Sequence, residues 1–260
     1  MQLGLGLHVR PDRRLGAITD QIAALGYQSI HAHFPTGCDA KLARQLARAC
    51  TDSGLSILAV SGYANPLRPD DAPMGFSQHQ LGDLIELMAR LDCRRLISWS
   101  GSYAAAPRAG HPDNATPAAW ETLYQALDEL FPLLDEAEAM LLLAPQRNHV
   151  LNNAERTARF CGEFNSPYLR LLYQASNLLG PDLTATRDEQ IANDIVTMAR
   201  WIGQVELEAR GDESDLLLPD LDLILHNVRK VDLTVPLSVA AAPLEQAGAA
   251  RHAVLSHILV

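Results

Sequence analysis

The sequence predicts an α/β fold, a closed (β/α)8 barrel, on three observations. Short apolar runs that resemble buried strands recur about eight times, and each is followed by a stretch with helical periodicity. Most of these runs are continuous in Leu, Ile and Val, as is typical of parallel strands that are covered on both faces. The chain length of 260 residues also matches the size of one such barrel, roughly 250 residues.

The eight predicted strands are separated by segments long enough for the crossover helices that parallel neighbours require. In chain order they are Leu3–His8, Gln28–His33, Ser56–Ser61, Arg95–Ser100, Met140–Ala144, Leu169–Gln174, Gln204–Ala209 and Pro236–Ala241. Thr116 with Pro117, Asn153 and Asp188 are predicted helix starts. No linker or low-complexity tract divides the chain, which predicts a single domain over residues 1–260. Residues 212–235 are the least regular part, and the sequence leaves their layout open.

Charge and composition exclude several classes of function. The formal net charge is −10, and no basic stripe is present, which argues against a nucleic-acid partner. No apolar run reaches the roughly 18 residues that a membrane span needs, and no signal-peptide pattern opens the chain, so we expect a cytoplasmic protein without a membrane partner. The four cysteines form no C-x-x-C pair and are expected to be free thiols.

Several segments, in collinear order, resemble the xylose isomerase-like TIM-barrel family, which contains sugar phosphate isomerases and epimerases and, more distantly, endonuclease IV. The likeness covers most of the chain. Its segments are Val60–Leu67, Trp99–Ser102, Val150–Asn153, Leu171–Leu178, Ala209–Asp212 and Pro236–Val239.

The resemblance implies a divalent metal held by acidic residues at the ends of strands five, six and eight, together with a histidine. Such an ion prefers oxygen ligands and polarises the sugar as a Lewis acid. In this chain the three acidic positions fall on Ala144, Gln174 and Ala240, none of which can be an anionic ligand. The sequence therefore predicts that the family's metal (Mn, Mg, Co or Zn) is not supported, and no cofactor is expected.

Other titratable side chains lie at predicted strand ends, where a barrel of this kind carries its catalytic groups. His31 and His33 share one strand face because strand side chains alternate, and Glu206 and Glu208 do the same. A rebuilt acid–base site is one interpretation; packing of the histidines under the rim, with a partly solvated Glu pair, is the other. The candidate catalytic residues are His8, His31, His33, Glu206 and Glu208.

The predicted ligand-binding residues are aromatic or carry hydrogen-bonding groups suited to hydroxyl-rich molecules. They are Tyr63, Asn65, Trp99, Ser100, Gln174, Asn177 and Arg210. Neither Ser61-Gly62 nor Ser100-Gly101 belongs to a G-x-S-x-G elbow, so the sequence does not support a nucleophilic serine. His149 is expected at the surface.

Two functions stay open. The first is a barrel that binds a small polyhydroxy, sugar-like ligand or a partner without metal-dependent turnover; the second is an active isomerase, epimerase or lyase with the rebuilt site. The second requires the His and Glu side chains to converge within a few ångströms, with a strongly perturbed pKa. A homodimer is the expectation for either.

Overall fold

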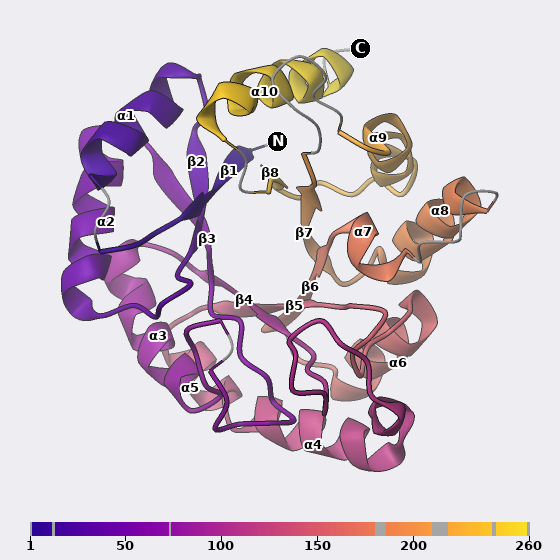
Figure 1. The fold of residues 1–260 in the computed structure, drawn as a ribbon. Coiled ribbons are helices and arrows are strands. Elements are labelled where there is room, and N and C mark those ends of the chain that lie inside the picture. The colour runs from indigo at the N-terminus through magenta and orange to yellow at the C-terminus, as the bar shows by residue number, and fades with distance from the viewer. Residues whose placement is uncertain are drawn as a thin grey trace.

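In the computed structural model of the chain, a closed barrel of parallel strands lies inside a layer of helices (Figure 1). The structure describes residues 2–11, 14–72, 74–179, 186–209, 218–240 and 243–258. The eight described strands pair in chain order, and β8 pairs with β1 to close the barrel. The predicted (β/α)8 TIM barrel is confirmed.

The strands lie close to the predicted apolar runs. They are β1 (Leu3–His8), β2 (Ser29–His33), β3 (Ser56–Ser61), β4 (Arg95–Trp99), β5 (Met140–Ala144), β6 (Leu169–Tyr173), β7 (Ile202–Leu207) and β8 (Leu237–Val239). Strand β7 begins two residues earlier than expected, since Ile202 already pairs with Leu171 of β6. Strand β8 is shorter than the predicted run, because its ladder with β7 ends at Val239.

The helices and short 3-10 turns connect consecutive strands. They are α1 (Leu15–Ala24), α2 (Ala40–Asp52), α3 (Gln80–Met88), η1 (Ala89–Leu91), η2 (Pro112–Ala115), α4 (Pro117–Asp128), α5 (Phe131–Glu136), α6 (Ala154–Phe164), α7 (Ala175–Leu178), α8 (Arg187–Met198), α9 (Leu221–Lys230) and α10 (Leu244–Ile258). Thr116 and Asn153 cap α4 and α6 through their side chains, as predicted. Asp188 is not a cap, because α8 begins at Arg187 and Asp188 lies in its first turn. Within the irregular segment 212–235, the described part contains α9.

Two apolar cores hold the fold together. The larger one fills the layer between strands and helices, and a smaller one lies separately, formed by buried side chains of β3 to β6. Contacts from α10 fasten the end of the chain to its beginning: Tyr27 donates a hydrogen bond of 2.8 Å to the Ala247 carbonyl, and Arg251 donates one of 2.9 Å to the Gly26 carbonyl. No helix in the described ranges combines the length and the hydropathy that crossing a membrane would require.

Candidate functional site

A cavity of about 300 Å³ opens where the strands end. Strand-end residues of β1, β2, β3, β4, β7 and β8 and the connections that follow them supply its wall. The lining residues are His8, His33, Phe34, Pro35, Ser61, Tyr63, Met74, Trp99, Arg108, Gln146, Gln174, Asn177, Glu206, Glu208, Ala209 and Ala240. This is the mouth at which a (β/α)8 barrel places its chemistry.

A buried histidine at the floor of the mouth joins two strands that are far apart in the sequence. Nδ1 of His31 lies 2.9 Å from Oε2 of Glu206, and Nε2 lies in a short hydrogen bond with Oγ of Ser61. The side chain of His31 is fully buried, and Ser61 and Glu206 are 2% and 4% exposed. Because the carboxylate can only accept at Nδ1, the neutral ring carries its proton there and accepts from the Ser61 hydroxyl at Nε2.

The carboxylate of Glu206 is itself held in place by β7 and β8. Glu206 and Ser238 are direct partners in the ladder between these strands, and the Ser238 hydroxyl donates to Oε2 over 3.2 Å. The side-chain amide of Gln204 donates to Ser238 over 2.9 Å. A chain of hydrogen bonds thus runs from Gln204 through Ser238, Glu206 and His31 to Ser61, and fixed networks of this kind hold their members in one geometry.

His33 lies directly above this chain, between His8 and His31. Its ring centroid is 4.1 Å from that of His31 and 5.4 Å from that of His8. Burial lowers the pKa of His33 well below its usual value, and the neighbouring rings of His31 and His8 lower it further. His33 is therefore a neutral imidazole at pH 7 in the cavity wall, able to accept a hydrogen bond from a ligand.

An aromatic wall continues from His33 across β3 and β4. The ring of Tyr63 stacks on Trp99 at 4.8 Å and lies 6.0 Å from His33. Burial raises the pKa of Tyr63 and the charge of Glu206 raises it further, whereas a hydrogen bond with the Ser61 side chain acts in the opposite direction. Tyr63 is therefore a neutral phenol, and its ring with Trp99 offers a flat surface to a ligand.

The structure brings most of the predicted site residues to the cavity but not all of them. His8, His33, Glu206 and Glu208 line it, and so do Tyr63, Trp99, Gln174 and Asn177. His31 lies one layer deeper, behind Ser61 and Glu206. Arg210 is outside the described residues.

Asn65 and Ser100 do not line the cavity, and they stabilise the loops behind it. The Asn65 amide donates to the Ser102 carbonyl over 2.7 Å, and the Ser100 hydroxyl accepts from the Leu151 backbone N–H over 3.3 Å. Their polar groups thus form hydrogen bonds with the backbone of the connections after β3, β4 and β5. The prediction placed them at the mouth because they follow strand ends, but the turns there direct them away from it.

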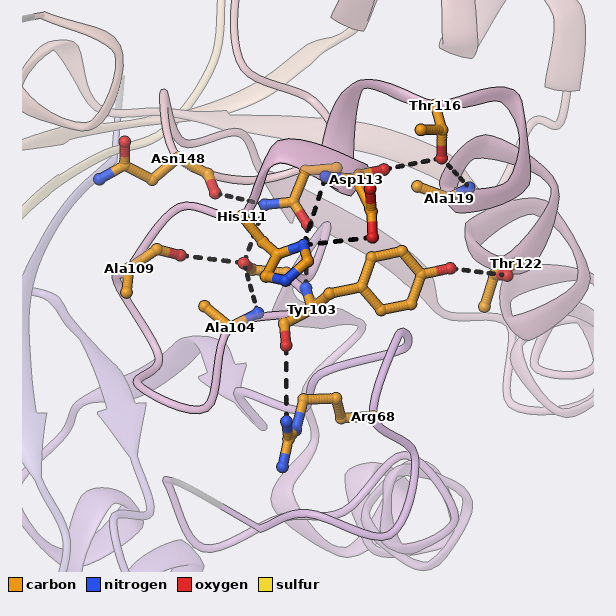
Figure 2. A network of polar contacts seen from close by, with 12 residues as sticks. Arg68, Tyr103, Ala104, Ala109, His111, Asp113, Thr116, Ala119, Thr122 and Asn148 are labelled. Atoms are coloured by element: carbon orange, nitrogen blue, oxygen red, sulfur yellow. Dashed lines mark hydrogen bonds and ion pairs between the residues drawn. The ribbon is translucent and has the colours of Figure 1, made fainter.

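The connection after β4 adds a residue that the sequence did not indicate. Arg108 lines the cavity from this loop, which is tied down by polar contacts shown in Figure 2. The Ser102 hydroxyl donates to the Ala109 carbonyl over 2.9 Å, and the Asn114 amide bonds to both Ser102 and the Asn148 carbonyl over 2.8 Å. The loop starts at Gly101, whose φ is +79° and where a Cβ would lie only 2.6 Å from Oδ1 of Asn65. Arg108 therefore lines the cavity from a loop that these hydrogen bonds hold in place.

His149 is not at the surface, contrary to the expectation from its loop position. Its side chain is 1% exposed, it lies edge-on to Trp99 at 5.7 Å, and its Nε2 donates to the Pro107 carbonyl over 2.8 Å. Burial lowers the pKa of His149 to about 4. His149 therefore supports the aromatic wall from behind as a neutral ring.

The positions of the acids that the family resemblance implies have different surroundings. Ala144 packs in the apolar cluster with Trp99, Leu142 and Leu172, whereas Gln174 and Ala240 line the cavity. Elsewhere at the mouth, His31, His33 and Glu206 each place one possible ligand atom within 4.8 Å of the others. Two imidazoles and a carboxylate suit zinc in principle. An ion bound there would replace one of the two hydrogen bonds of His31.

The closed parallel barrel with its cavity at the strand ends is the architecture of a known class of barrels. The chain belongs to the xylose isomerase-like TIM-barrel family, whose model matches residues 19–215. No curated protein sequence matches the chain.

Solved structures of several enzymes share this fold at low sequence identity. The 3-keto-D-glucoside 4-epimerase YcjR from E. coli is 14% identical, with a TM-score of 0.72 over 100% of both chains. An L-ribulose 3-epimerase is 17% identical, with a TM-score of 0.72 over 98% of this chain and 94% of the epimerase. An AP endonuclease of family 2 from Brucella melitensis is 16% identical, with a TM-score of 0.67 over 97% and 98% of the two chains. At these identities the likeness is one of fold.

Proposed function

We propose that this protein is an acid–base enzyme that isomerises or epimerises a small polyhydroxy carbonyl compound bound in the mouth cavity. One observation carries the proposal: the Glu206 carboxylate, in the cavity wall, is held by the buried His31 at 2.9 Å. Of the two functions that the sequence leaves open, this arrangement favours the active one. His31, His33 and Glu206 place possible reacting atoms within 4.8 Å of one another, and the pKa of His33 is lowered well below its usual value, which supports this choice.

Glu206 is the group that takes the proton from the carbon next to the carbonyl group. Both hydrogen bonds that Glu206 accepts from described residues fall on Oε2, from His31 and from Ser238. They fix the carboxylate in one orientation. The proton taken up by Glu206 is then returned to the neighbouring carbon in an isomerisation; in an epimerisation the same carbon takes a proton on its opposite face from a second donor. General acid–base catalysis of this kind contributes roughly 100- to 10,000-fold.

The negative charge that develops on the substrate oxygen needs hydrogen-bond donors, and the cavity provides both neutral and charged ones. The side-chain amides of Gln146, Gln174 and Asn177 line the wall together with the exposed guanidinium of Arg108. Donors aimed at a developing charge stabilise the transition state more than the ground state. The neutral ring of His33, also in the cavity wall, accepts a hydrogen bond from a substrate hydroxyl.

The same surfaces explain why a sugar-like molecule is the proposed ligand. A ring with one apolar face can lie on Tyr63 and Trp99, while amide groups meet its hydroxyls. The relatives with solved structures include epimerases of keto sugars, which fits this proposal.

The acidic metal site of the family does not fit this chain. A methyl group stands at Ala144 and at Ala240 and a neutral amide at Gln174, and Ala144 is packed among apolar side chains rather than facing the cavity. We therefore propose that proton transfer relies on the side chains described above, and no step is assigned to a metal. The cytoplasmic location, the absence of nucleic-acid and membrane partners and the homodimer are likewise proposals.

Proton exchange with solvent tests the proposal without knowledge of the product. Chelator-treated protein is incubated in D2O with a set of ketoses and 3-keto glycosides, and carbon-bound deuterium is measured by mass spectrometry. We expect deuterium to enter next to the carbonyl of at least one compound, and Glu206→Gln to lower the rate at least about 100-fold. Glu163→Gln, on the exposed face of α6, is the matched control.

The alternative outcome is equally definite. Saturable binding of a sugar with no deuterium incorporation would support ligand binding without turnover. Exchange that appears only after addition of Mn²⁺, Mg²⁺, Co²⁺ or Zn²⁺, with a rise in melting temperature, would show that a metal site exists despite the residues at 144, 174 and 240.

A further inference from the structure

The hydroxyl of Ser61 occupies an unusual position for a serine at a strand end of this barrel. Buried serines on or next to the neighbouring strands bond to the backbone: Ser29 donates to the Leu3 carbonyl, Ser98 accepts from the N–H of Ala64 after β3, and Ser100 accepts from the N–H of Leu151 after β5. The Ser61 hydroxyl instead bonds to Nε2 of His31 and lies in the wall of the cavity. A backbone role does not account for it.

The three side chains stand in the order carboxylate, imidazole, hydroxyl. Oε2 of Glu206 holds Nδ1 of His31 at 2.9 Å, and the opposite ring nitrogen holds Ser61. The carboxylate fixes the tautomer in which Nε2 is free to accept the serine proton, and it stabilises the ring when that proton arrives. This is the arrangement that activates a serine for attack, and it recurs on unrelated folds in any chain order. Here the carboxylate comes from β7, the imidazole from β2 and the hydroxyl from β3.

We propose that Ser61 is a nucleophile and that the mouth cavity hydrolyses a small ester or lactone of a polyhydroxy compound. This activity goes beyond the proposed proton transfer, although it uses the same Glu206–His31 pair. A lactone suits the site because its flat ring can lie on Tyr63, which lines the cavity together with Ser61. That placement brings the ring carbonyl beside Oγ.

The reaction balances with water as the only co-reactant. Oγ of Ser61 forms a bond to the carbonyl carbon while its proton passes to Nε2 of His31. The bond from that carbon to the ring oxygen then breaks, and the departing oxygen takes the proton from His31. Water then gives a proton to His31 and attacks the acyl carbon. The bond from that carbon to Oγ breaks, Ser61 takes the proton from His31, and the acid is released. The amides of Gln146 and Gln174 and the guanidinium of Arg108 are the donors in the cavity wall for the oxyanion.

Covalent labelling with diisopropyl fluorophosphate tests the nucleophile directly. Attack of Oγ on phosphorus displaces fluoride, so one adduct is expected at Ser61 by peptide mapping. His31→Gln should slow labelling at least about 100-fold, because the hydroxyl loses its base. Ser61→Ala should abolish the adduct, and Ser100→Ala, at the end of the neighbouring strand, should label like the unchanged protein. Hydrolysis of glucono-1,5-lactone, followed in a pH-stat, should depend on Ser61 in the same way.

An adduct elsewhere, no adduct under saturating reagent, or labelling that His31→Gln leaves unchanged would overturn the proposal. If Ser61→Ala fails to fold, Ser61→Cys gives the same information: iodoacetamide should alkylate it in a manner that depends on His31. Deuterium exchange in the same preparations separates the two proposals. Labelling without exchange removes only the isomerase function, and exchange without labelling removes only the nucleophile.

Discussion

The interior of the barrel has two halves that are equally buried and differ in what holds them together. On the side of β4 to β6 the interior is apolar, with Ile97, Trp99, Leu142, Ala144 and Leu172 packed on one another together with Ala59. On the side of β2, β7 and β8 it is a hydrogen-bonded chain of polar residues. These are Gln204, Ser238, Glu206 and His31, which ends on Ser61 of β3.

The difference shows how one barrel can combine a part that stabilises the fold with a part that positions reacting groups. Apolar packing gains free energy from each buried carbon and tolerates small errors of position. A buried polar chain gains little net free energy and is costly when any member lacks its partner, but it fixes orientation and proton positions. We therefore expect changes in the apolar half to act on stability and changes in the polar half to act on activity.

Replacement of the Glu206 carboxylate should give the largest effect. Glu206→Gln keeps the shape of the side chain but removes the charge, so the rate of carbon-bound proton exchange should fall about 100- to 10,000-fold. The melting temperature should change little in comparison. Glu208→Gln, on the same face of β7 and also in the cavity wall, should have a smaller effect on the rate. Equal losses in both variants would contradict the assignment of Glu206 as the base.

Truncation in the apolar half should show the opposite pattern. Leu142 is fully buried within that cluster, and Leu142→Ala should lower the free energy of unfolding by about 2 to 5 kcal/mol through lost contacts and a residual cavity. Denaturant titration measures this change. Activity per folded molecule should remain near that of the unchanged protein, and a large loss of it would mean that the two halves are coupled.

Acid should weaken the apolar half through His149, which lies behind Trp99. Burial lowers the pKa of His149 from 6.5 to about 4, so the unfolded chain binds a proton there that the folded chain does not. This group therefore costs stability as the pH falls from 6.5 through about 4. Because one pKa unit corresponds to about 1.4 kcal/mol, the loss reaches about 3 kcal/mol.

The variant His149→Gln isolates this contribution, since its amide can still donate to the Pro107 carbonyl. The pH dependence of its unfolding free energy should be flatter than that of the unchanged protein between pH 6.5 and 4. The control His226→Gln changes an exposed residue of α9 and should leave the curve as it is. An unchanged slope in the His149 variant would mean that protonation is accommodated in the folded state.

Removal of the Ser238 hydroxyl from the polar chain should give the smallest effect. Ser238→Ala deletes the 3.2 Å hydrogen bond to Glu206 and the acceptor of the Gln204 amide but leaves His31 in place. We expect a loss of about 1 kcal/mol in stability and a reduction of a few-fold in rate. A rate loss as large as that of Glu206→Gln would show that Ser238 carries more of the positioning than its distance implies.

The sequence predicted the strands well because their signal is local. Continuous apolar runs mark each of them, and the errors are confined to ends, such as the early start of β7 and the short β8. The sequence also identified His31, His33 and Glu206 as candidates from their places at strand ends. It did not pair Ser61 with His31, and it assigned Asn65 and Ser100 to the mouth although they stabilise loops.

Those failures have a physical cause. His31 and Ser61 are 30 residues apart. The ladder between β2 and β3 shifts by one residue between Ile30 and His31. Whether the two side chains meet therefore depends on a strand irregularity that has no local sequence signal. Glu206 is 175 residues from His31. Their contact exists only because the barrel closes with a definite stagger of its strands.

By itself, then, the sequence determined the barrel and the end of the barrel at which the polar side chains lie. It also determined that positions 144, 174 and 240 carry no acids. Each of these follows from a local pattern or from the identity of a residue. Only the tertiary structure decided that one half of the interior is apolar and the other a polar chain ending on Ser61. Strand periodicity fixes which face a side chain takes, whereas register and closure fix which side chain it meets.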